Sequence, residues 1–202
     1  MPETRTIQVY KVTELSEKAK DHAFYRWLEY DSYSWQDENR DTLDSFCKLF
    51  PVKVAHWEYD DLHYSIRCEL SDYCYAPVSM SGWRLATYIW NNYGHVLFPG
   101  KYYSKGRYVD GKYQYKSRTS KIILNPRNCC LTGFCRDEDM LDPVYDFLQK
   151  PDGTTFEELM KACCEAWGRA CMQDMEASTT MEAFEEFCET NDMLFDVSGR
   201  LF

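Results

Sequence analysis

Residues 131–177 read LTGFCRDEDMLDPVYDFLQKPDGTTFEELMKACCEAWGRACMQDMEA, and this stretch decides the fold of the chain. Its apolar residues recur at steps of three and four, which is the spacing of one face of an α-helix. Thr154 and Thr155 each stand three residues before a glutamate, the capping-box pattern that starts a helix. The stretch therefore predicts helices, each with an apolar face that must pack against another part of the chain.

The first of these helices follows Asp137. Carboxylates at Asp137, Glu138 and Asp139 suit the positive end of a helix dipole. Pro143 lies too far inside for the favoured first-turn position if Asp137 is the N-cap. We therefore expect the regular helix to start nearer Leu141.

The second helix is the longest of the three. From Phe156 to Ala177 it would span about 33 Å at 1.5 Å per residue. Its broad apolar face includes Cys163, Cys164 and Cys171, which we expect to be reduced core thiols. A third helix follows Thr179, with another capping-box glutamate three residues later.

The order of elements along the chain predicts an α+β fold. Strands and helices do not alternate as a parallel sheet requires, so we expect a small antiparallel sheet packed with about six helices in a single domain, residues 1–202. A strongly aromatic helix carrying Trp83 and Trp90 should begin after Ser81 and end at Gly94. The other expected elements are strands at 6–12, 52–59, 63–70 and 121–124, helices ending near 30 and 50, turns at 60–62 and 110–111, and a final strand within 193–202.

The segment of about residues 99–120 is a basic, tyrosine-rich ribbon inserted in the fold. Tyrosines alternate with cations there, a pattern that suits base stacking combined with phosphate contacts. Lysines also protect an exposed edge strand from aggregation, and a basic ribbon can dock on an acidic face of its own chain or of a second copy. Its cationic residues are Lys101, Lys105, Arg107, Lys112, Lys116 and Arg118.

Charge is unevenly distributed along the chain. The whole chain has a formal net charge of −10, whereas residues 101–121 carry seven basic residues and one acidic residue. Residues 136–202 carry seventeen acidic and five basic residues. This asymmetry concerns partners rather than fold. Because the acidic body would repel a phosphate backbone, the sequence argues against direct nucleic-acid binding.

Composition narrows the expected compartment. The 45% of apolar residues supports a core, and no apolar run approaches the ~20 residues of a membrane span. The first residues lack the pattern of a signal peptide, and the ten cysteines are then better read as reduced than as a disulfide framework. We expect a cytoplasmic protein without a membrane contact and without a cofactor.

Three segments resemble a known group of proteins. TIQVYKVTELSEKAKDHAFYRWLEY (6–30), SYSWQDENRDTLDSFCKLFPVKVAHWEY (32–59) and CCLTGFCRDEDMLDPVYDFLQKPDGTTFEELMKACCEAW (129–167) are similar to small acidic proteins of bacteriophages, prophages and plasmids. Some of those proteins carry a loose label of antitoxin in a toxin–antitoxin system. The resemblance implies a mobile-element origin and a bacterial host cytoplasm, and it brings no catalytic residues with it.

These observations together favour an accessory protein that binds and inhibits a bacterial defence protein, as an anti-CRISPR or anti-restriction factor does. An acidic surface can occupy a basic groove built for nucleic acid, which is nucleic-acid mimicry. The expected partner is then a host protein with a basic surface. The residues that we expect to form the partner-binding acidic face are Asp137, Glu138, Asp139, Asp142, Asp146, Glu157, Glu158, Glu165, Glu185, Glu186 and Glu189.

Two alternatives remain open from the sequence. In the first, the protein is an antitoxin that neutralises a partner toxin, and the ribbon is available to touch operator DNA. The inhibitor and the antitoxin are both compatible with a homo-oligomer. In the second, Asp37 and Asp41 share one face of a helix and hold a divalent cation in a hydrolase or nuclease. Carboxylates gathered in the first turn of a helix are more often solvated, so the second alternative is the weaker.

Overall fold

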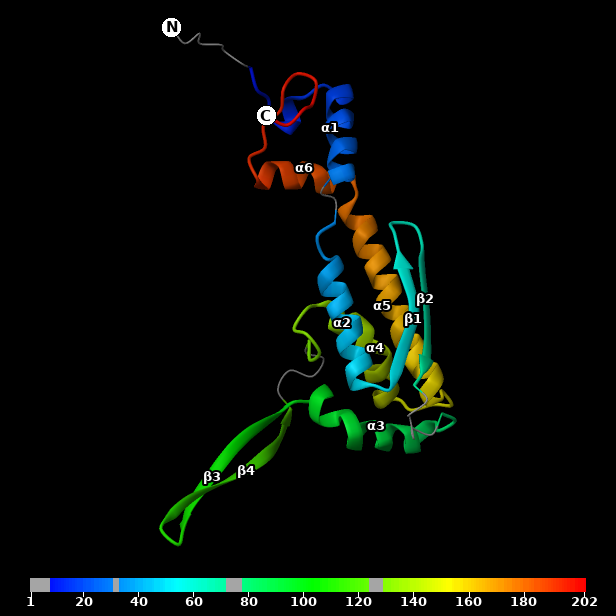
Figure 1. Cartoon of the computed structure of the whole chain (residues 1–202), viewed down its shortest axis with the longest axis vertical. Coiled ribbons are helices and arrows are strands. Elements are labelled where there is room, and N and C mark those ends of the chain that lie inside the picture. Colours follow the sequence, from blue (N-terminus) through cyan, green and yellow to red (C-terminus); the bar gives the residue numbers. More distant parts are fainter. Residues whose placement is uncertain (1–7, 31–32, 72–77, 124–128) are drawn as a thin grey trace. The chain divides into compact units, whose positions relative to one another are not determined.

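The computed structural model describes residues 8–30, 33–71, 78–123 and 129–202 (Figure 1). Within these residues it contains six α-helices and four strands, and the strands pair in two separate two-stranded sheets. Helices with antiparallel strand pairing confirm the α+β class. The sheet differs from the expected one, because each strand pairs with its neighbour in sequence and the two hairpins do not join.

The described residues form two compact units. We call the first the terminal unit; it comprises the described residues of Met1–Asp37, Tyr59–His63 and Cys171–Phe202. The second, which we call the central unit, comprises Glu38–Glu58 and Tyr64–Ala170. Each unit has buried apolar side chains of its own.

The helices of the central unit are α2 (Gln36–Leu49), α3 (Gly82–Leu97), α4 (Arg136–Gln149) and the first part of α5 (Phe156–Ser178), and α5 carries Trp167. This indole is fully buried, and its Nε1–H donates a 2.9 Å hydrogen bond to the main-chain carbonyl of Asn39. The ring of Trp57 meets it edge-on, with 5.5 Å between the ring centroids. A buried indole whose N–H has found an acceptor is a stable core element.

The first hairpin consists of β1 (Val52–Tyr59) and β2 (Tyr64–Leu70), and it lies beside α5 (Figure 1). Its turn is held by the carboxylate of Asp60, which accepts hydrogen bonds from the main-chain N–H groups of Leu62 and His63 at 2.8 and 2.6 Å. The predicted turn at 60–62 is therefore confirmed, and an aspartate side chain fixes it, as is common in turns.

The second hairpin is the predicted ribbon. β3 (Gly100–Val109) and β4 (Lys112–Ile123) pair antiparallel around Asp110 and Gly111, which both have positive φ. The expected separate strand at 121–124 is instead the end of β4, with residue 124 outside the described residues.

Two helices extend further than the sequence predicts. α3 (Gly82–Leu97) continues through Gly94, because Ile89 and Leu97 on either side of the glycine are fully buried. Glycine costs a helix only about 1 kcal/mol, less than the burial of one such side chain gains. α4 starts at Arg136 rather than near Leu141 and carries Pro143 inside it.

Burial of apolar side chains also explains why α4 starts at Arg136 and continues through Pro143. An interior proline costs a helix about 3 kcal/mol, whereas full burial of one large apolar side chain gains about 1.5–3 kcal/mol. Met140, Leu141 and Val144 are all fully buried around Pro143. Their combined burial exceeds the cost of the proline, so the helix persists on both sides of it.

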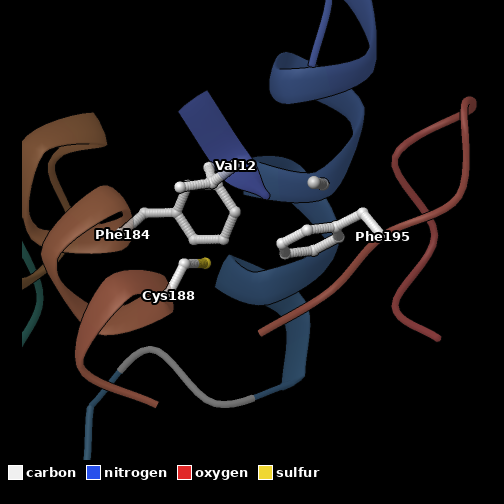
Figure 2. Packing of buried hydrophobic residues seen from close by; sticks show 5 residues of the cluster. Val12, Phe184, Cys188 and Phe195 are labelled. Atoms are coloured by element: carbon white, nitrogen blue, oxygen red, sulfur yellow. The ribbon is translucent and has the colours of Figure 1, made fainter. Parts of the chain in front are cut away.

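The terminal unit is built from η1 (Val12–Glu14), α1 (Glu17–Tyr30), the end of α5, and α6 (Met181–Thr190). In Figure 2 the rings of Phe184 and Phe195 point toward one another, with Val12 and Cys188 beside them. Phe195 pairs with Tyr10 through two main-chain hydrogen bonds of 2.9 Å. Isolated bridges of Phe195 with Tyr10 and with Leu201 stand in place of the two terminal strands that the sequence predicts; residues 6 and 7 of the first strand lie outside the described residues.

Candidate functional site

The candidate site is a groove between α3 and α4 in the central unit. Trp83, Ala86, Thr87 and Trp90 line it from α3. These positions follow the i, i+3, i+4, i+7 spacing, so they form one continuous face of the helix. The groove therefore arises from the helical period of α3, and its α3 wall is mainly aromatic.

The opposite wall comes from α4 and from the segment after α3. Tyr145, Leu148 and Gln149 belong to α4, and Phe98 follows the last residue of α3. The walls enclose about 540 Å³. This volume lies within the range of about 300–1,000 Å³ that is usual for binding pockets.

Exposure distinguishes the groove from the core. Trp83 is 73% exposed and Trp90 is 51% exposed, although both belong to the largest apolar side-chain type. Single exposed apolar residues are common on proteins, but several that gather around a cavity mark an interaction site. Tryptophan is also the residue type most enriched at interface hot spots.

Tyr145 fixes the floor of the groove. It is buried, and its hydroxyl donates a 3.3 Å hydrogen bond to the carbonyl of Leu97 at the end of α3. Its ring lies edge-on to Phe98 at 5.5 Å, and Phe98 in turn contacts Trp90 at 4.9 Å. Burial raises the pKa of the Tyr145 phenol, so the group stays protonated and joins the two walls.

The lining offers little polarity to a ligand. Of the described residues that form the groove, none is charged, and only Thr87, Tyr145 and Gln149 are polar. The Thr87 hydroxyl already donates a 2.8 Å hydrogen bond to the carbonyl of Trp83. The groove is therefore suited to bind apolar side chains rather than a charged small molecule.

Negative charge lies on the α4 wall outside the groove. Glu138 and Asp146 are exposed, and Asp139 and Asp142 are half-buried. Asp139 forms a 2.8 Å ion pair with Arg136. An apolar groove beside carboxylates favours a partner segment that combines apolar anchors with basic flanks.

Asp137 is a correction to the predicted acidic face. Its side chain is fully buried and accepts hydrogen bonds from the N–H groups of Leu131, Thr132 and Gly133. The hydroxyls of Thr132 and Thr42 also donate to it. It is the second residue of α4 rather than its N-cap. A carboxylate with five donors is held inside the fold and is not available to a partner.

The other predicted acidic residues fall on separate surfaces. In the central unit, Glu158 caps α5 through Thr155, and Glu157 pairs with Lys161 at 2.8 Å. Glu165 is exposed on α5. In the terminal unit, Glu185 forms an ion pair with Lys20, while α6 also carries exposed Glu186 and Glu189.

The predicted basic residues lie on the ribbon. Lys112 is exposed next to the turn, and Lys105 faces Lys116 in the strand register. Lys101 lies where the register shifts between Gly100 and Tyr102. The side chains of Lys101, Lys105, Arg107, Lys116 and Arg118 are outside the described part of the structure.

No metal centre is assembled from the described residues. Asp37 and Asp41 are both exposed on α2, and no group of three or more His, Cys, Asp or Glu side chains in the described ranges is placed to hold a metal ion. The nine cysteines that the structure describes are reduced and form no disulfide with one another, and Cys163, Cys164 and Cys171 are buried as predicted.

One thiol cluster in the central unit was not predicted. The Cys164 thiol hydrogen-bonds Cys68 on β2, and Cys163 and Cys47 lie close enough to Cys164 to help raise its pKa. The hydrogen bond from Cys164 lowers the pKa of Cys68, whereas burial raises that of Cys47 to about 11. Cys68 is therefore the more readily ionised of these two half-buried thiols.

The aromatic groove was also not predicted as a site. The available signal was the spacing of Trp83, Thr87 and Trp90, which places all three on one helical face. The sequence does not show that α4 packs opposite this face and forms the second wall of the groove.

Comparison with known proteins adds no assignment. No family model, no curated protein sequence and no solved structure matches this chain. Among the described helices, none is both long enough and apolar enough to cross a membrane.

Proposed function

We propose that this protein binds a basic partner protein through the groove between α3 and α4. The observation that carries the proposal is the pair of exposed tryptophans, Trp83 and Trp90, on the rim of an uncharged cavity. The partner supplies a helix or extended segment with apolar side chains for the groove and Lys or Arg on its flanks. Helix-in-groove binding uses this kind of surface.

The proposed basic character of the partner follows from the negative charge of this chain. The chain has a net charge of −10, and besides the buried Asp137 α4 carries four acidic residues and one basic residue. Complementary charge accelerates association and excludes acidic competitors. The groove contributes the apolar part of the affinity, which salt does not screen, and the carboxylates contribute a part that salt does screen.

The resemblance to accessory proteins of phages and plasmids supports a bacterial defence protein as the partner. Defence nucleases and effectors bind nucleic acid in basic channels. An acidic protein that occupies such a channel inhibits the defence protein. We therefore propose inhibition of a defence nuclease or effector as the consequence of binding.

The test is a comparison of three tagged proteins in nuclease-treated bacterial lysate: the wild type, the Trp83→Ala/Trp90→Ala double variant, and Trp35→Ala. Trp35 is a matched control, because it is 53% exposed and lies outside the groove. The proposal expects one basic protein to be retained by the wild type and by Trp35→Ala and lost with the double variant. Purified partner should then bind the wild type at least about tenfold more tightly than the double variant.

Salt separates the two parts of the proposal. Raising the salt should weaken binding of the purified partner without abolishing it, because the groove contact persists. Equal retention of the partner by the double variant and the wild type would rule out the groove. Affinity unchanged by salt would rule out the acidic contribution and leave an apolar contact alone.

A further inference from the structure

The terminal unit contains a second cavity, of about 480 Å³, with different chemistry. α1 supplies Ala23, Arg26 and Trp27, which follow the i, i+3, i+4 spacing of one helical face. α6 supplies Phe184 and Phe187. The ring of Trp27 lies 5.4 Å from that of Phe184 and 5.8 Å from that of Phe187, so the walls are aromatic.

The C-terminal segment forms the remaining wall with Met193, Phe195, Gly199, Arg200 and Leu201. Figure 2 shows the ring of Phe195, a residue of this wall, facing that of Phe184. The segment is held in place at several points. His22 hydrogen-bonds the carbonyl of Ser198 at 2.8 Å, and Phe202 donates to the carbonyl of Leu194 at 2.9 Å. The wall is therefore an ordered part of the unit.

Positive charge distinguishes this cavity from the groove. Arg26 and Arg200 both line it and are exposed, and of the described residues around it none is acidic. Asp196 lies near Arg200, but its carboxylate is engaged by Ser198 and by the N–H of Arg200. Within the described residues, Arg26 has no ion-pair partner. Two guanidinium groups thus gather at an aromatic cavity in an acidic protein.

We propose that this cavity binds a small planar aromatic molecule that carries an anionic group. The rings of Trp27, Phe184 and Phe187 would contact the planar part, and Arg26 and Arg200 would hold the anion. A guanidinium group pairs with phosphate or carboxylate through two parallel hydrogen bonds and also stacks on flat rings. The shared chemistry is found in nucleoside monophosphates and in aromatic carboxylates.

The test is isothermal titration of the full chain with four probes: adenosine monophosphate, adenosine, inorganic phosphate and indole-3-acetate. The proposal expects at least one of the two anionic aromatics to bind. Adenosine and inorganic phosphate should each bind at least about tenfold more weakly, because each lacks one half of the recognised chemistry. Binding of the monophosphate alone would assign a nucleotide site, and binding of indole-3-acetate alone would assign a carboxylate site.

Three variants make the test specific. Arg26→Gln and Arg200→Gln should each weaken the binding of the anionic aromatic at least about tenfold. Lys18→Gln is the matched control, because Lys18 is an exposed cation of α1 that does not line the cavity. All three positions are exposed, so melting temperatures should stay close to that of the wild type. Failure of both anionic aromatics to bind, or equal binding by the arginine variants, would overturn the proposal.

This inference is independent of the proposed protein partner. The Trp83→Ala/Trp90→Ala variant should bind the anionic aromatic as the wild type does, since neither residue lines this cavity. Loss of ligand binding in that variant would instead assign the titrated site to the groove and contradict the proposal.

Discussion

The carboxylate of Asp137 accepts a 3.2 Å hydrogen bond from the hydroxyl of Thr42, which stands 95 residues earlier in the chain. Both side chains are fully buried in the central unit. The same carboxylate binds the N–H groups of Leu131, Thr132 and Gly133. It therefore ties the loop before α4 to α2.

Replacing this carboxylate should be costly. Asp137→Ala leaves three N–H groups and two hydroxyls without their acceptor. Each buried polar group left without a hydrogen-bond partner costs about 1–3 kcal/mol. We expect the free energy of unfolding to fall by about 3 kcal/mol or more in urea denaturation. Glu138→Ala is the control, because the neighbouring side chain is exposed and its loss should cost less than about 0.5 kcal/mol. Equal costs for the two variants would contradict the role of Asp137.

The contact between β2 and α5 depends on a glycine. A Cβ atom at Gly168 would lie 2.7 Å from the ring of Tyr64, which is closer than such atoms approach. Gly168→Ala gains about 1 kcal/mol of helix propensity but loses about 1–3 kcal/mol to overpacking. We therefore expect a net destabilisation of about 1 kcal/mol in urea denaturation.

The same substitution should change sign without the ring. In a Tyr64→Ala background the collision is absent, so Gly168→Ala should stabilise by up to about 1 kcal/mol. A double-mutant cycle measures this coupling directly. A Gly168→Ala effect of the same sign and size in both backgrounds would show that Tyr64 does not limit the site.

Cys68 should be the most reactive thiol of its cluster. The Cys164 hydrogen bond lowers the pKa of Cys68, while burial and Asp44 raise that of Cys47 to about 11. Since the thiolate is the reactive form, iodoacetamide at pH 8 should modify Cys68 before Cys47, although both are half-buried. Peptide mapping by mass spectrometry gives the order. Cys164→Ala removes the donor and should slow the modification of Cys68; an unchanged rate would contradict this assignment.

Asp196 should make the C-terminal turn, residues 196–200, sensitive to acid. Its hydrogen bonds from Ser198 and Arg200 lower the pKa of its carboxyl from the ordinary value of 3.8. A lowered pKa in the folded state stabilises the turn above the unfolded pKa, and this contribution is lost as the pH falls through the folded pKa. Amide hydrogen exchange at Ser198 and Arg200 should therefore lose protection below about pH 4. Asp196→Asn should lack this transition, and its persistence in the variant would assign the transition to another group.

Local signals allowed much of the fold to be predicted. The turn at Asp60 and the ribbon around Gly111 are formed by neighbouring residues, so their sequence patterns were sufficient. Gly94 and Pro143 misled the prediction, because burial of the apolar side chains on either side of them outweighs their helix-breaking tendency. A single sheet was predicted where the structure has two separate hairpins, because the sequence does not show which strands pair with one another.

The candidate site was less predictable for the same reason. Trp83 and Trp90 belong to one helical face, but only the approach of α4 turns that face into a groove. Asp137 was assigned to the surface because its donor Thr42 is distant in sequence. The cavity at Arg26 and Arg200 joins residues from opposite ends of the chain, and no local pattern connects them.

Gly199 should be essential for the C-terminal wall of the second cavity. Its φ is +81°, and a Cβ atom there would collide with the main-chain carbonyl of Ala19 on α1. Gly199→Ala therefore combines backbone strain of about 1–2 kcal/mol with a collision against main chain, which a rotamer change cannot relieve. We expect the C-terminal turn to detach, with loss of hydrogen-exchange protection at Ser198 and Arg200. Gly133→Ala isolates the strain, because φ is +96° there and a Cβ atom meets nothing within 4 Å. If both variants lose only about 1–2 kcal/mol of stability and Gly199→Ala keeps its protected turn, the close approach to Ala19 does not hold the wall.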